Sequence, residues 1–339
     1  MVKQLFPKAA RQRLRFLTNY PAIYYRLWAN YGYDLQRFLR WSSVAGVASE
    51  QLALRAWIDA DYHKIEKALA LKSPRPGFGK VVIHRLTENL QRYLAQFGAD
   101  RSTSIAMAVL DAYARFNRDH GVDTNDLERR LERLRSHCRG NGEGGVKQVR
   151  REEILAAARI DLEPFFFSRH SVRHFSDEPV EPELIERAVY LASKTPTVCN
   201  RQSLKVHAYF DADCQRVLSC QMGNSGFGDQ VKVALVVTAD SRTFFSVGER
   251  NQGWIDGGLF SMSLVYALHS LGLGSCCLNW SVEKEYDRKL KTVTDIQPWE
   301  MVIMMIGVGK LPEALHVAQS PRKTVDDLLV RGVTREATH

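Results

Sequence analysis

The sequence predicts two structural parts: a helical region over residues 1–137, and a domain of mixed helices and strands over residues 151–333. In the first part, apolar residues recur every three or four positions, as one face of a helix requires. The second part contains alternating and continuous apolar runs of strand length. Four of the six residues from 140 to 145 are glycine, so residues 138–150 are the best candidate for a linker. Residues 334–339 are predicted to be a polar tail.

The first part contains three strongly periodic segments, at Glu50–Ala70, Val81–Phe97 and Ser104–His120. Each is predicted to be a helix. A turn cluster at Ser73–Gly79 holds two prolines and two glycines, and it must end the first helix before the second begins. A further, highly charged helix is predicted over Asp126–Ser136. This part of the chain is therefore expected to be all-helical.

The second part alternates helices with short strands. Pro182 begins a helix that runs through Lys194, because proline at the first turn has no N–H to lose. Leu204–Phe210 alternates apolar and polar residues, the pattern of a half-buried strand. Ile255–Leu271 is apolar nearly all round, which predicts a central helix. The remaining elements are buried strands at Val233–Val237, Gly274–Leu278 and Met301–Ile306, and a short last helix at Val325–Val330.

The composition excludes several classes of protein. Apolar residues make up 45% and charged residues 25%, so the chain is not disordered as a whole. No apolar run approaches the roughly 20 residues of a membrane-spanning helix. The first residues lack the basic-then-apolar layout of a secretion signal. The six cysteines show no zinc-finger spacing, and we expect reduced thiols in a cytosolic protein.

The net charge of +9 is divided unequally along the chain. Residues 1–150 hold 26 Lys and Arg against 14 Asp and Glu, a net +12, whereas residues 151–339 hold 21 against 24, a net −3. The first forty residues combine eight basic residues and a single acidic one, Asp34, with nine aromatic residues. We favour a helical domain whose aromatic residues form its core and whose basic residues face solvent. Contact of residues 1–42 with an anionic membrane ranks second. Nucleic acid ranks a distant third, because no recognised binding motif accompanies the charge.

Four separated clusters in the second part carry candidate chemistry. The first runs from Ser168 to Phe175, and in an extended segment Arg169, Ser171 and Arg173 project from one face. Two guanidinium groups beside a hydroxyl can hold a phosphate or the carbonyl edge of a polar ring. An exposed edge strand rich in arginine would have the same pattern.

The other three clusters could bind a flat ligand. Thr195–Gln202 follows a helix, and it is either a stop signal or a loop that offers backbone and amide groups to a heterocycle. Gly272–Trp280 leads from a helix into a buried strand, and its glycines allow close approach to the backbone. The segment 306–323 ends with another phosphate-competent pair, Arg322 and Lys323.

In order and spacing these clusters resemble the FMN-dependent nitroreductase family, over about residues 163–330. The shared motifs are the Arg-x-Ser-x-Arg entry, Thr-Pro-x-x-x-Asn-x-Gln after the first helix, the Gly-Leu-Gly-Ser-Cys turn and an Arg-Lys pair after proline. The resemblance implies an α+β fold, a sheet wrapped by helices, that forms a homodimer through the long central helix. FMN would lie at the dimer interface and contact both subunits.

Position by position, the resemblance implies three groups of flavin contacts. The phosphate and the pyrimidine side would be held by Arg169, His170, Ser171 and Arg173, with Arg322 and Lys323 neutralising the phosphate. The partner subunit would reach the ring with Pro196, Thr197, Val198 and Asn200, with Gln202 nearby. The polar edge, face and N5 of the ring would meet Asn224, Ser275, Cys276, Leu278 and Asn279.

One position departs from the family pattern. Many members carry a lysine near the N1 and O2 edge of the flavin, shortly after the asparagine, and Phe227 stands at about that place. Arg173 or Lys232 could substitute for it, so the group that stabilises reduced flavin stays open.

For three side chains that could take part in chemistry, we favour a structural role. Adjacent cysteines in a strand point to opposite faces, so Cys276 and Cys277 cannot readily form a relaxed disulfide. Asp256, at the start of the central helix, is predicted to be its cap.

The resemblance implies an oxidoreductase that transfers hydride from NADH or NADPH through flavin N5 to an unidentified small-molecule acceptor. That chemistry needs no catalytic acid–base pair and no metal. Two alternatives stay open: an FMN-dependent dehydrogenase or oxidase of a biosynthetic intermediate, and a non-catalytic flavin fold that docks at the membrane. The N-terminal extension also resembles that of nitroreductase-like proteins linked with surface polysaccharide biosynthesis. The expected location is the cytoplasm, either free or peripheral on the inner face of the membrane.

Overall fold

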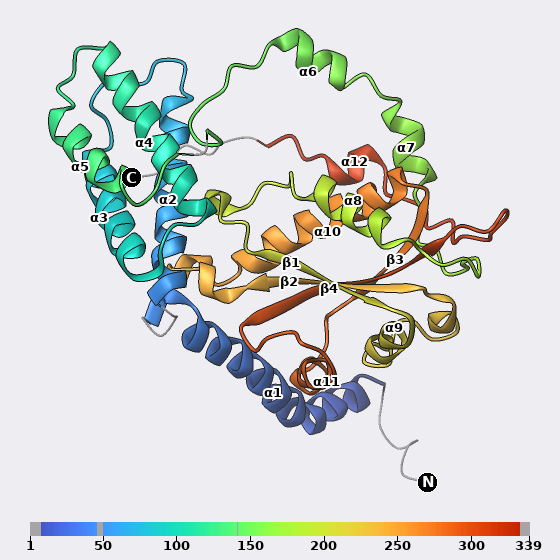
Figure 1. Cartoon of the computed structure of the whole chain (residues 1–339). Helices are drawn as coiled ribbons and strands as arrows, with labels where there is room; N and C mark the ends of the chain where they lie inside the picture. Colours follow the sequence, from blue (N-terminus) through green and yellow to red (C-terminus); the bar gives the residue numbers. More distant parts are fainter. Residues whose placement is uncertain (1–7, 46–49, 141, 333–339) are drawn as a thin grey trace.

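The computed structural model describes residues 8–45, 50–140 and 142–332, with side chains from residue 20 onward. Within these residues, an N-terminal region of helices precedes a four-stranded sheet that carries helices on both faces (Figure 1). The predicted order of a helical region and an α+β domain is therefore confirmed. The helices of the N-terminal region are α1 (Lys8–Trp41), α2 (Glu50–Leu69), α3 (Lys80–Phe97), α4 (Arg101–Asp119) and α5 (Asn125–Arg135).

Helices α2, α3 and α4 pack around a core of their own. Its centre includes Ile58, Leu90 and Leu110, one from each helix, and all three are fully buried. A capping box fixes the start of α4: the Asp100 carboxylate accepts the Thr103 N–H at 2.9 Å, and the Thr103 hydroxyl accepts the Asp100 N–H at 2.8 Å. The predicted helix ends lie within three residues of the observed ones.

The sheet has the strand order β1–β2–β4–β3, and every neighbouring pair is antiparallel. β2 and β4 occupy the centre and are buried on both faces, which explains their continuous apolar sequences. β1 and β3 form the edges. The strands are β1 (Leu204–Phe210), β2 (Val233–Asp240), β3 (Leu273–Asn279) and β4 (Glu300–Lys310).

Helices cover both faces of the sheet (Figure 1). On one face lie α8 (Pro182–Ala192) and α10 (Gln252–Ser270), which share a core with inward side chains of β2 and β4. On the other face lie α9 (Asp211–Leu218) and α11 (Lys284–Val293), which share a second core with the opposite side chains of the same strands. Because the strand pleat alternates, each central strand supplies both cores.

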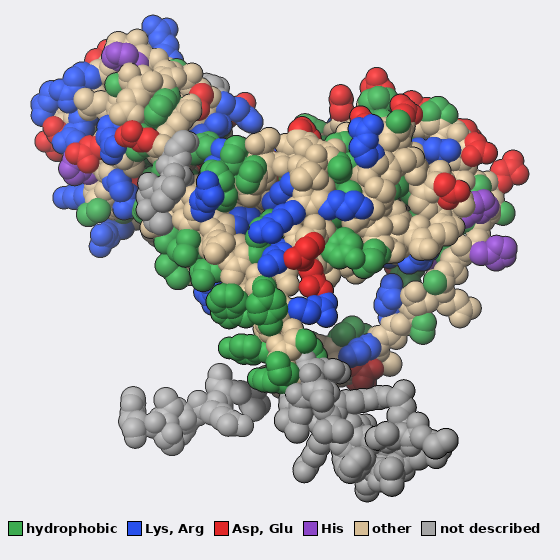
Figure 2. Space-filling view, turned by 90° about the horizontal axis from the view of Figure 1, so that it is seen from below, with side chains coloured by type: hydrophobic (Ala, Val, Ile, Leu, Met, Phe, Trp, Pro, Cys, Tyr) green, Lys and Arg blue, Asp and Glu red, His purple; other side chains and the backbone are tan. Residues whose placement is uncertain are grey.

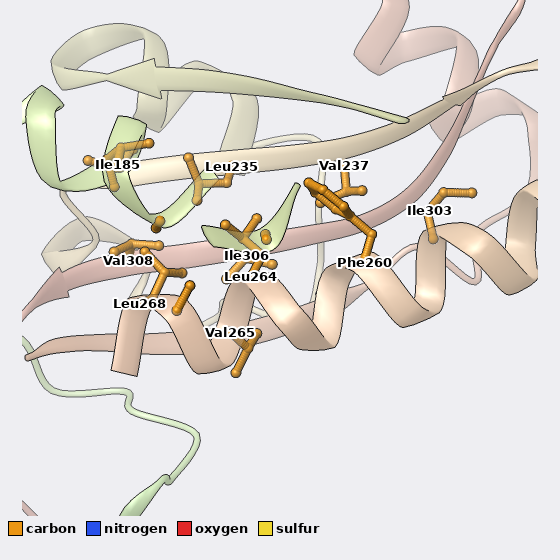
Figure 3. Close-up of a cluster of buried hydrophobic side chains, with 14 of the residues drawn as sticks. Ile185, Leu235, Val237, Phe260, Leu264, Val265, Leu268, Ile303, Ile306 and Val308 are labelled. Carbon is orange, nitrogen blue, oxygen red and sulfur yellow. The ribbon is translucent and has the colours of Figure 1, made fainter. Parts of the chain in front are cut away.

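The central helix α10 lies very close to the sheet. Figure 3 shows Leu264 and Leu268 of this helix against Ile306 of β4, in a cluster that is almost fully buried. Gly257 permits the close approach, since a Cβ added there would lie 2.6 Å from Cγ1 of Ile303. The prediction of a central, tightly packed helix is confirmed for this face of α10.

Helix α1 runs beside α11 (Figure 1). A buried polar cluster fastens the two helices together. The Asp287 carboxylate of α11 accepts a hydrogen bond from the Tyr33 hydroxyl at 2.7 Å and one from Nε1 of Trp280 at 3.2 Å. It also pairs with Lys291 at 3.2 Å and with Arg37 of α1 at 3.6 Å. Burial acts to raise the pKa of Asp287, but the cations and donors around it bring that pKa below its ordinary value.

The opposite side of α1 is apolar and exposed. Between residues 20 and 39, nine large apolar side chains are at least 45% exposed. By contrast, the side chain of Phe38 packs in the core and is only 9% exposed. None of the helices in the described ranges is long and apolar enough to cross a membrane. The interpretation that the early aromatic residues form a core is therefore wrong for Tyr20, Tyr24, Tyr25, Trp28 and Tyr31, while the side chains of Phe6 and Phe16 lie outside the described part.

The glycine-rich segment packs against α4 and α2. A Cβ added at Gly144 would lie 2.6 Å from the carbonyl oxygen of Ile105, so only glycine fits there. The Gly145 N–H donates to the Glu66 carboxylate at 3.1 Å. Asn141 lies outside the described residues. The segment leads to two short exposed helices, α6 (Arg151–Ala157) and α7 (Leu162–Ser168).

Candidate functional site

The segment from Arg169 to Arg173 lies along the open edge of β3. Ser171 forms a parallel bridge with Ser275, and the Val172 N–H donates to the Ser275 carbonyl oxygen at 2.9 Å. Val172 is buried while Ser171 and Arg173 are exposed, the alternation predicted for an extended segment. The structure thus places the first predicted cluster beside the third, although the two lie far apart in the sequence.

Arg169 and Arg173 carry positive charges that no carboxylate balances. Among the described residues, neither guanidinium forms an ion pair, and Arg173 donates to the carbonyl oxygen of Ser171 at 3.4 Å. Burial raises the pKa of the Cys276 thiol, and the charge of Arg173 acts against that rise. Burial and Cys276 raise the pKa of Cys277, and there Arg169 opposes them. Two unbalanced cations at one strand edge are suited to an anionic group of a ligand.

The predicted contacts on β3 fall on opposite faces of the strand. Cys276 and Leu278 are 1% and 3% exposed and pack in the core beneath α9 and α11. Because Ser275 sends its carbonyl oxygen outward to Val172, the alternating ladder directs the backbone groups of Cys277 outward as well. Asn279, two residues further on, is exposed on the same side as Cys277.

Cys277 is therefore a better candidate for ligand contact than Cys276. Cys277 is an exposed residue whose N–H points away from β4, whereas Cys276 is buried. The motif alone did not distinguish the two residues. The strand alternation, counted from Ser275, would have done so.

The segment 196–202 forms a strained loop after α8. Cys199, Asn200 and Gln202 have φ angles of 49°, 52° and 48°, in the left-handed region that residues other than glycine rarely adopt. The hydroxyl of Thr197 accepts the Gln202 N–H at 3.0 Å and helps to hold this conformation. Pro196 is exposed. Three strained residues in one loop are typical of a functional site, where the surrounding structure holds them in place.

Asp256 holds this loop, which corrects its predicted role as the cap of its own helix. It lies inside α10, is 2% exposed, and accepts the backbone N–H of Val198 at 3.1 Å. Its other oxygen accepts a hydrogen bond from Nε2 of Gln252 at 2.8 Å. The carboxylate therefore fixes a loop that is distant in sequence to the first turns of the central helix.

A column of four side chains joins the loop to the helical region. The Arg85 guanidinium lies 4.7 Å from the ring centroid of Trp57, which stacks on Phe245 at 4.1 Å and 17°. The guanidinium of Arg201 lies 4.5 Å from the ring centroid of Phe245 and pairs with Glu249. No sequence pattern predicted this column, because its members come from four separate segments.

A cavity of about 400 Å³ lies between the loop and the helical region. Its walls come from α2 and α4 on one side and from residues 200–205 on the other. Asp59 lines it and accepts a hydrogen bond from Ser102. Burial raises the pKa of Asp59 to about 6, although Ser102 and Arg55 act in the opposite direction. The sequence analysis missed this carboxyl group, which can exchange a proton near neutral pH.

Within one chain, the strained loop and the arginine segment lie at opposite ends of α10. Ser168, next to Arg169, lies 2.9 Å from Nε2 of His269 in the last turn, whereas Val198 binds Asp256 near the first. His269 and Asp256 are 13 residues apart, about 20 Å along a helix. One copy of the chain therefore keeps these two predicted groups of contacts apart.

The outer face of α10 is apolar and exposed. Ile255, Leu259 and Met262 follow one another at helical spacing and are 54%, 51% and 38% exposed. Gly258 lies on the same face, and no atom of the described residues comes within 4 Å of a Cβ added there. A face of this kind can accept a second copy of the helix.

The position that departs from the family pattern is a core position. Phe227 is 5% exposed and packs in the core beneath α9 and α11, so it brings no charge to the site. Lys232 pairs with Asp177 at 3.5 Å, whereas Arg173 forms no ion pair within the described ranges. The amide of Asn224 donates to the carbonyl oxygen of Leu218 at 2.9 Å. Of the two charged candidates, Arg173 is therefore the one without an ion pair in the described part of the chain.

Arg322 and Lys323 lie in the exposed segment between β4 and α12 (Val325–Leu328). Arg322 donates to the carbonyl oxygen of Ser320 at 2.7 Å. Neither side chain forms an ion pair in the described part of the chain. No contact of the described residues joins them to Arg169, so their place beside the phosphate stays a prediction.

Comparison with known proteins finds similarity in the C-terminal half of the chain. The model of the nitroreductase family matches residues 167–310. No curated protein matches the chain. Among solved structures, a nitroreductase family protein from Streptococcus pneumoniae TIGR4 is 20% identical, with 51% of this chain and 100% of that chain covered and a TM-score of 0.44.

Two other similar structures are described with the cofactor. An FMN-dependent nitroreductase from Clostridium difficile R20291 is 22% identical, with 52% of this chain and 99% of that chain covered and a TM-score of 0.39. A protein from Desulfovibrio desulfuricans, described as a nitroreductase in complex with FMN, is 19% identical, with 52% and 100% covered and a TM-score of 0.42.

The family match begins just before Arg169 and ends with the last residue of β4. It includes the arginine segment, the strained loop, α10 and the open edge of β3, and it leaves out Arg322, Lys323 and helices α1 to α6. Residues 167–310 therefore form a domain of the nitroreductase family, to which this chain adds an N-terminal helical region.

Proposed function

We propose that the chain is an FMN-dependent oxidoreductase of nitroreductase type that acts as a homodimer. One observation carries the proposal: Arg169 and Arg173, both without an ion pair in the described residues, flank an open strand edge with outward backbone groups. The cations suit the phosphate and the polar edge of FMN, and the strand edge suits its flat ring. These residues therefore fit the group that the family match implies.

A homodimer would complete this site. If two copies pack their α10 helices against each other in opposite directions, the first turn of one helix meets the last turn of the other. The partner's loop at 196–202 would then lie beside the Arg169 segment, although the two are about 20 Å apart in one chain. The exposed apolar face of α10 is the surface that such packing would bury.

The residues of the chain bind and orient, and the cofactor supplies the redox chemistry. A bound FMN would supply hydride-transfer chemistry at its N5, between NADH or NADPH and a small-molecule acceptor. Arg169 and Arg173 would hold the anionic part, with Arg173 closest to the role of the absent family lysine. The N–H of Cys277, which the strand alternation directs outward, would donate to a ring atom bound at the strand edge. A nicotinamide that stacks only transiently requires no dinucleotide-binding motif.

The first experiment measures flavin content. We expect purified protein to be yellow, with flavin absorbance that NADH or NADPH bleaches in the absence of oxygen. Arg169→Ala with Arg173→Ala should lose most of the bound FMN. The matched control is Arg216→Ala, an exposed arginine of α9 on the opposite face of the sheet. Colourless protein that takes up no added FMN would refute the proposal.

A second experiment tests the shared site. Leu259→Glu places a charge on the outer face of α10, and we expect a monomer with much weaker FMN binding, measured by light scattering and flavin fluorescence. Leu71→Glu, an equally exposed position of the helical region, should leave both unchanged. A monomer that keeps FMN would show that one chain suffices.

The nature of the electron donor separates this proposal from its alternatives. Bleaching by a biosynthetic substrate, with none by pyridine nucleotide, would favour an FMN-dependent dehydrogenase or oxidase. Bound FMN that no donor reduces would favour a non-catalytic flavin fold. A cytoplasmic location and the link with surface polysaccharide biosynthesis rest on the sequence and its resemblance alone. Contact of residues 1–42 with a membrane is a separate proposal that rests on α1.

A further inference from the structure

Helix α1 presents a continuous apolar stripe that no described residue covers. We define the α1 stripe as the exposed side chains that recur every three or four residues along one side of the helix. Tyr31 is the most exposed, at 72%, and Trp28 follows at 66%. Contiguous exposed apolar residues of this kind are typical of an interaction site. Its members are Ile23, Tyr24, Leu27, Trp28, Tyr31 and Leu35.

The stripe cannot turn inward, because the other side of α1 is fastened to the domain. Besides the cluster of Tyr33 and Arg37 with Asp287, the side-chain carbonyl of Asn30 accepts the backbone N–H of Lys284 at 2.7 Å. Arg26, one turn earlier, forms an ion pair with Glu283. These contacts span three turns of the helix, so the apolar side is held toward solvent.

Basic residues border the stripe. A groove of about 670 Å³ between α1 and α11 is lined by Trp28 and Tyr31 together with Lys284 and Arg288. The Arg288 guanidinium lies 5.2 Å from the ring centroid of Tyr33 and forms no ion pair among the described residues. Figure 2 looks onto this side of the molecule and shows hydrophobic side chains gathered along α1, with Lys and Arg side chains beside them. In the sequence before the stripe, residues 1–19 hold five Lys and Arg and no Asp or Glu.

We propose that the α1 stripe docks on the surface of an anionic phospholipid bilayer. Five of the nine exposed apolar side chains between residues 20 and 39 are Tyr or Trp. These rings combine an apolar body with a polar tip and prefer the depth of the lipid headgroups. The neighbouring Lys and Arg would meet lipid phosphates. A second copy of the same helix would bring its own positive charges against these, so like-charge repulsion disfavours self-association there.

The test uses the full chain and vesicles of phosphatidylglycerol mixed with phosphatidylcholine, compared with phosphatidylcholine alone. We expect the protein to sediment with the anionic vesicles and to show a blue shift of Trp28 fluorescence that Trp28→Phe removes. Trp28→Ser with Tyr31→Ser should lower the partition coefficient at least about tenfold, because two large rings no longer leave water. Arg288→Gln should lower it about fivefold, the effect of one cation near an anionic surface.

The control variant is Leu71→Ser with Val81→Ser, which removes two apolar side chains of the helical region that are 62% and 76% exposed but lie outside the stripe. It should sediment like the wild type. Equal loss in both variants, or no sedimentation of the wild type with anionic vesicles, would overturn the proposal. A stripe variant that changes the oligomeric state and not the sedimentation would assign the stripe to a second copy. Flavin absorbance, recorded on the same samples, reports on the redox site independently.

Discussion

Replacing Glu300 with Gln removes a buried charge that lies at the start of β4. Its carboxylate is fully buried and accepts hydrogen bonds from Nζ of Lys205 at 2.6 Å and from Nε2 of His207 at 3.0 Å. Burial acts to raise the pKa of Glu300, but these donors and the N–H of Gln297 outweigh it and hold the pKa at about 2. A glutamate in the unfolded chain has a pKa of about 4.3.

The difference between the pKa of Glu300 in the folded and in the unfolded chain sets the size and the sign of its contribution to stability. A gap of about two pKa units corresponds to about 3 kcal/mol at 1.36 kcal/mol for each unit. Because the folded-state pKa is the lower one, this stabilisation is present above about pH 4 and is lost as the pH falls toward 2. We therefore expect Glu300→Gln to lower the free energy of unfolding at neutral pH by up to about 3 kcal/mol.

Denaturant unfolding, followed by tryptophan fluorescence at neutral and at acidic pH, measures this difference. The gap between wild type and Glu300→Gln should narrow as the pH falls through the window between the two pKa values. Glu283→Gln is the matched control, since that carboxylate pairs with Arg26 at the surface and should contribute little. If Glu300→Gln unfolds with the stability and pH dependence of the wild type, the reasoning on this buried cluster is wrong.

Three further substitutions test other contacts. Gly257→Ala should destabilise the domain by about 1–3 kcal/mol, because the added methyl group clashes with Ile303. The neighbouring Gly258→Ala should be neutral or stabilising in the monomer. Equal unfolding midpoints of the two variants in urea would contradict the close packing of α10. Asp256→Ala leaves the Val198 N–H without its acceptor, so we expect a loss of about 1–3 kcal/mol and weaker FMN binding by calorimetry, with unchanged binding arguing against a role of the loop. Tyr33→Phe should cost about 1.5–3 kcal/mol in thermal unfolding, because it removes a hydrogen bond to the buried Asp287, and Tyr31→Phe on the exposed side should cost nothing measurable.

Local patterns predicted the four strands, the helices of the N-terminal region and the central helix, but not α9 or α11. The strand at Leu204–Phe210 was predicted with its observed bounds, since alternation of apolar residues follows directly from the pleat. The central strands were predicted too short. β4 begins at Glu300, whose buried carboxylate is paired by the distant His207, and β2 ends at Asp240, whose buried carboxylate is paired by the nearby Arg242. Apolar runs alone cannot show such ends.

The motifs located the arginine segment and the loop, but they could not show how the rest of the site is built. The part played by Asp256 depends on a contact with Val198, which is 58 residues away in the sequence. Asp59 and Trp57 belong to helix α2 of the N-terminal region. The periodicity of a helix indicates which of its sides is apolar, but it does not indicate which other segment packs against that side. For the same reason the aromatic pattern of α1 was compatible with a core, although the structure leaves that side open.

The stacked column of Arg85, Trp57, Phe245 and Arg201 has a consequence for how the chain comes apart. A protease that nicks the backbone between Gly145 and α6 would cut the covalent link between the two parts and leave their noncovalent contacts intact. The two fragments should then travel together through a sizing column and separate only when heat melts both in one cooperative step.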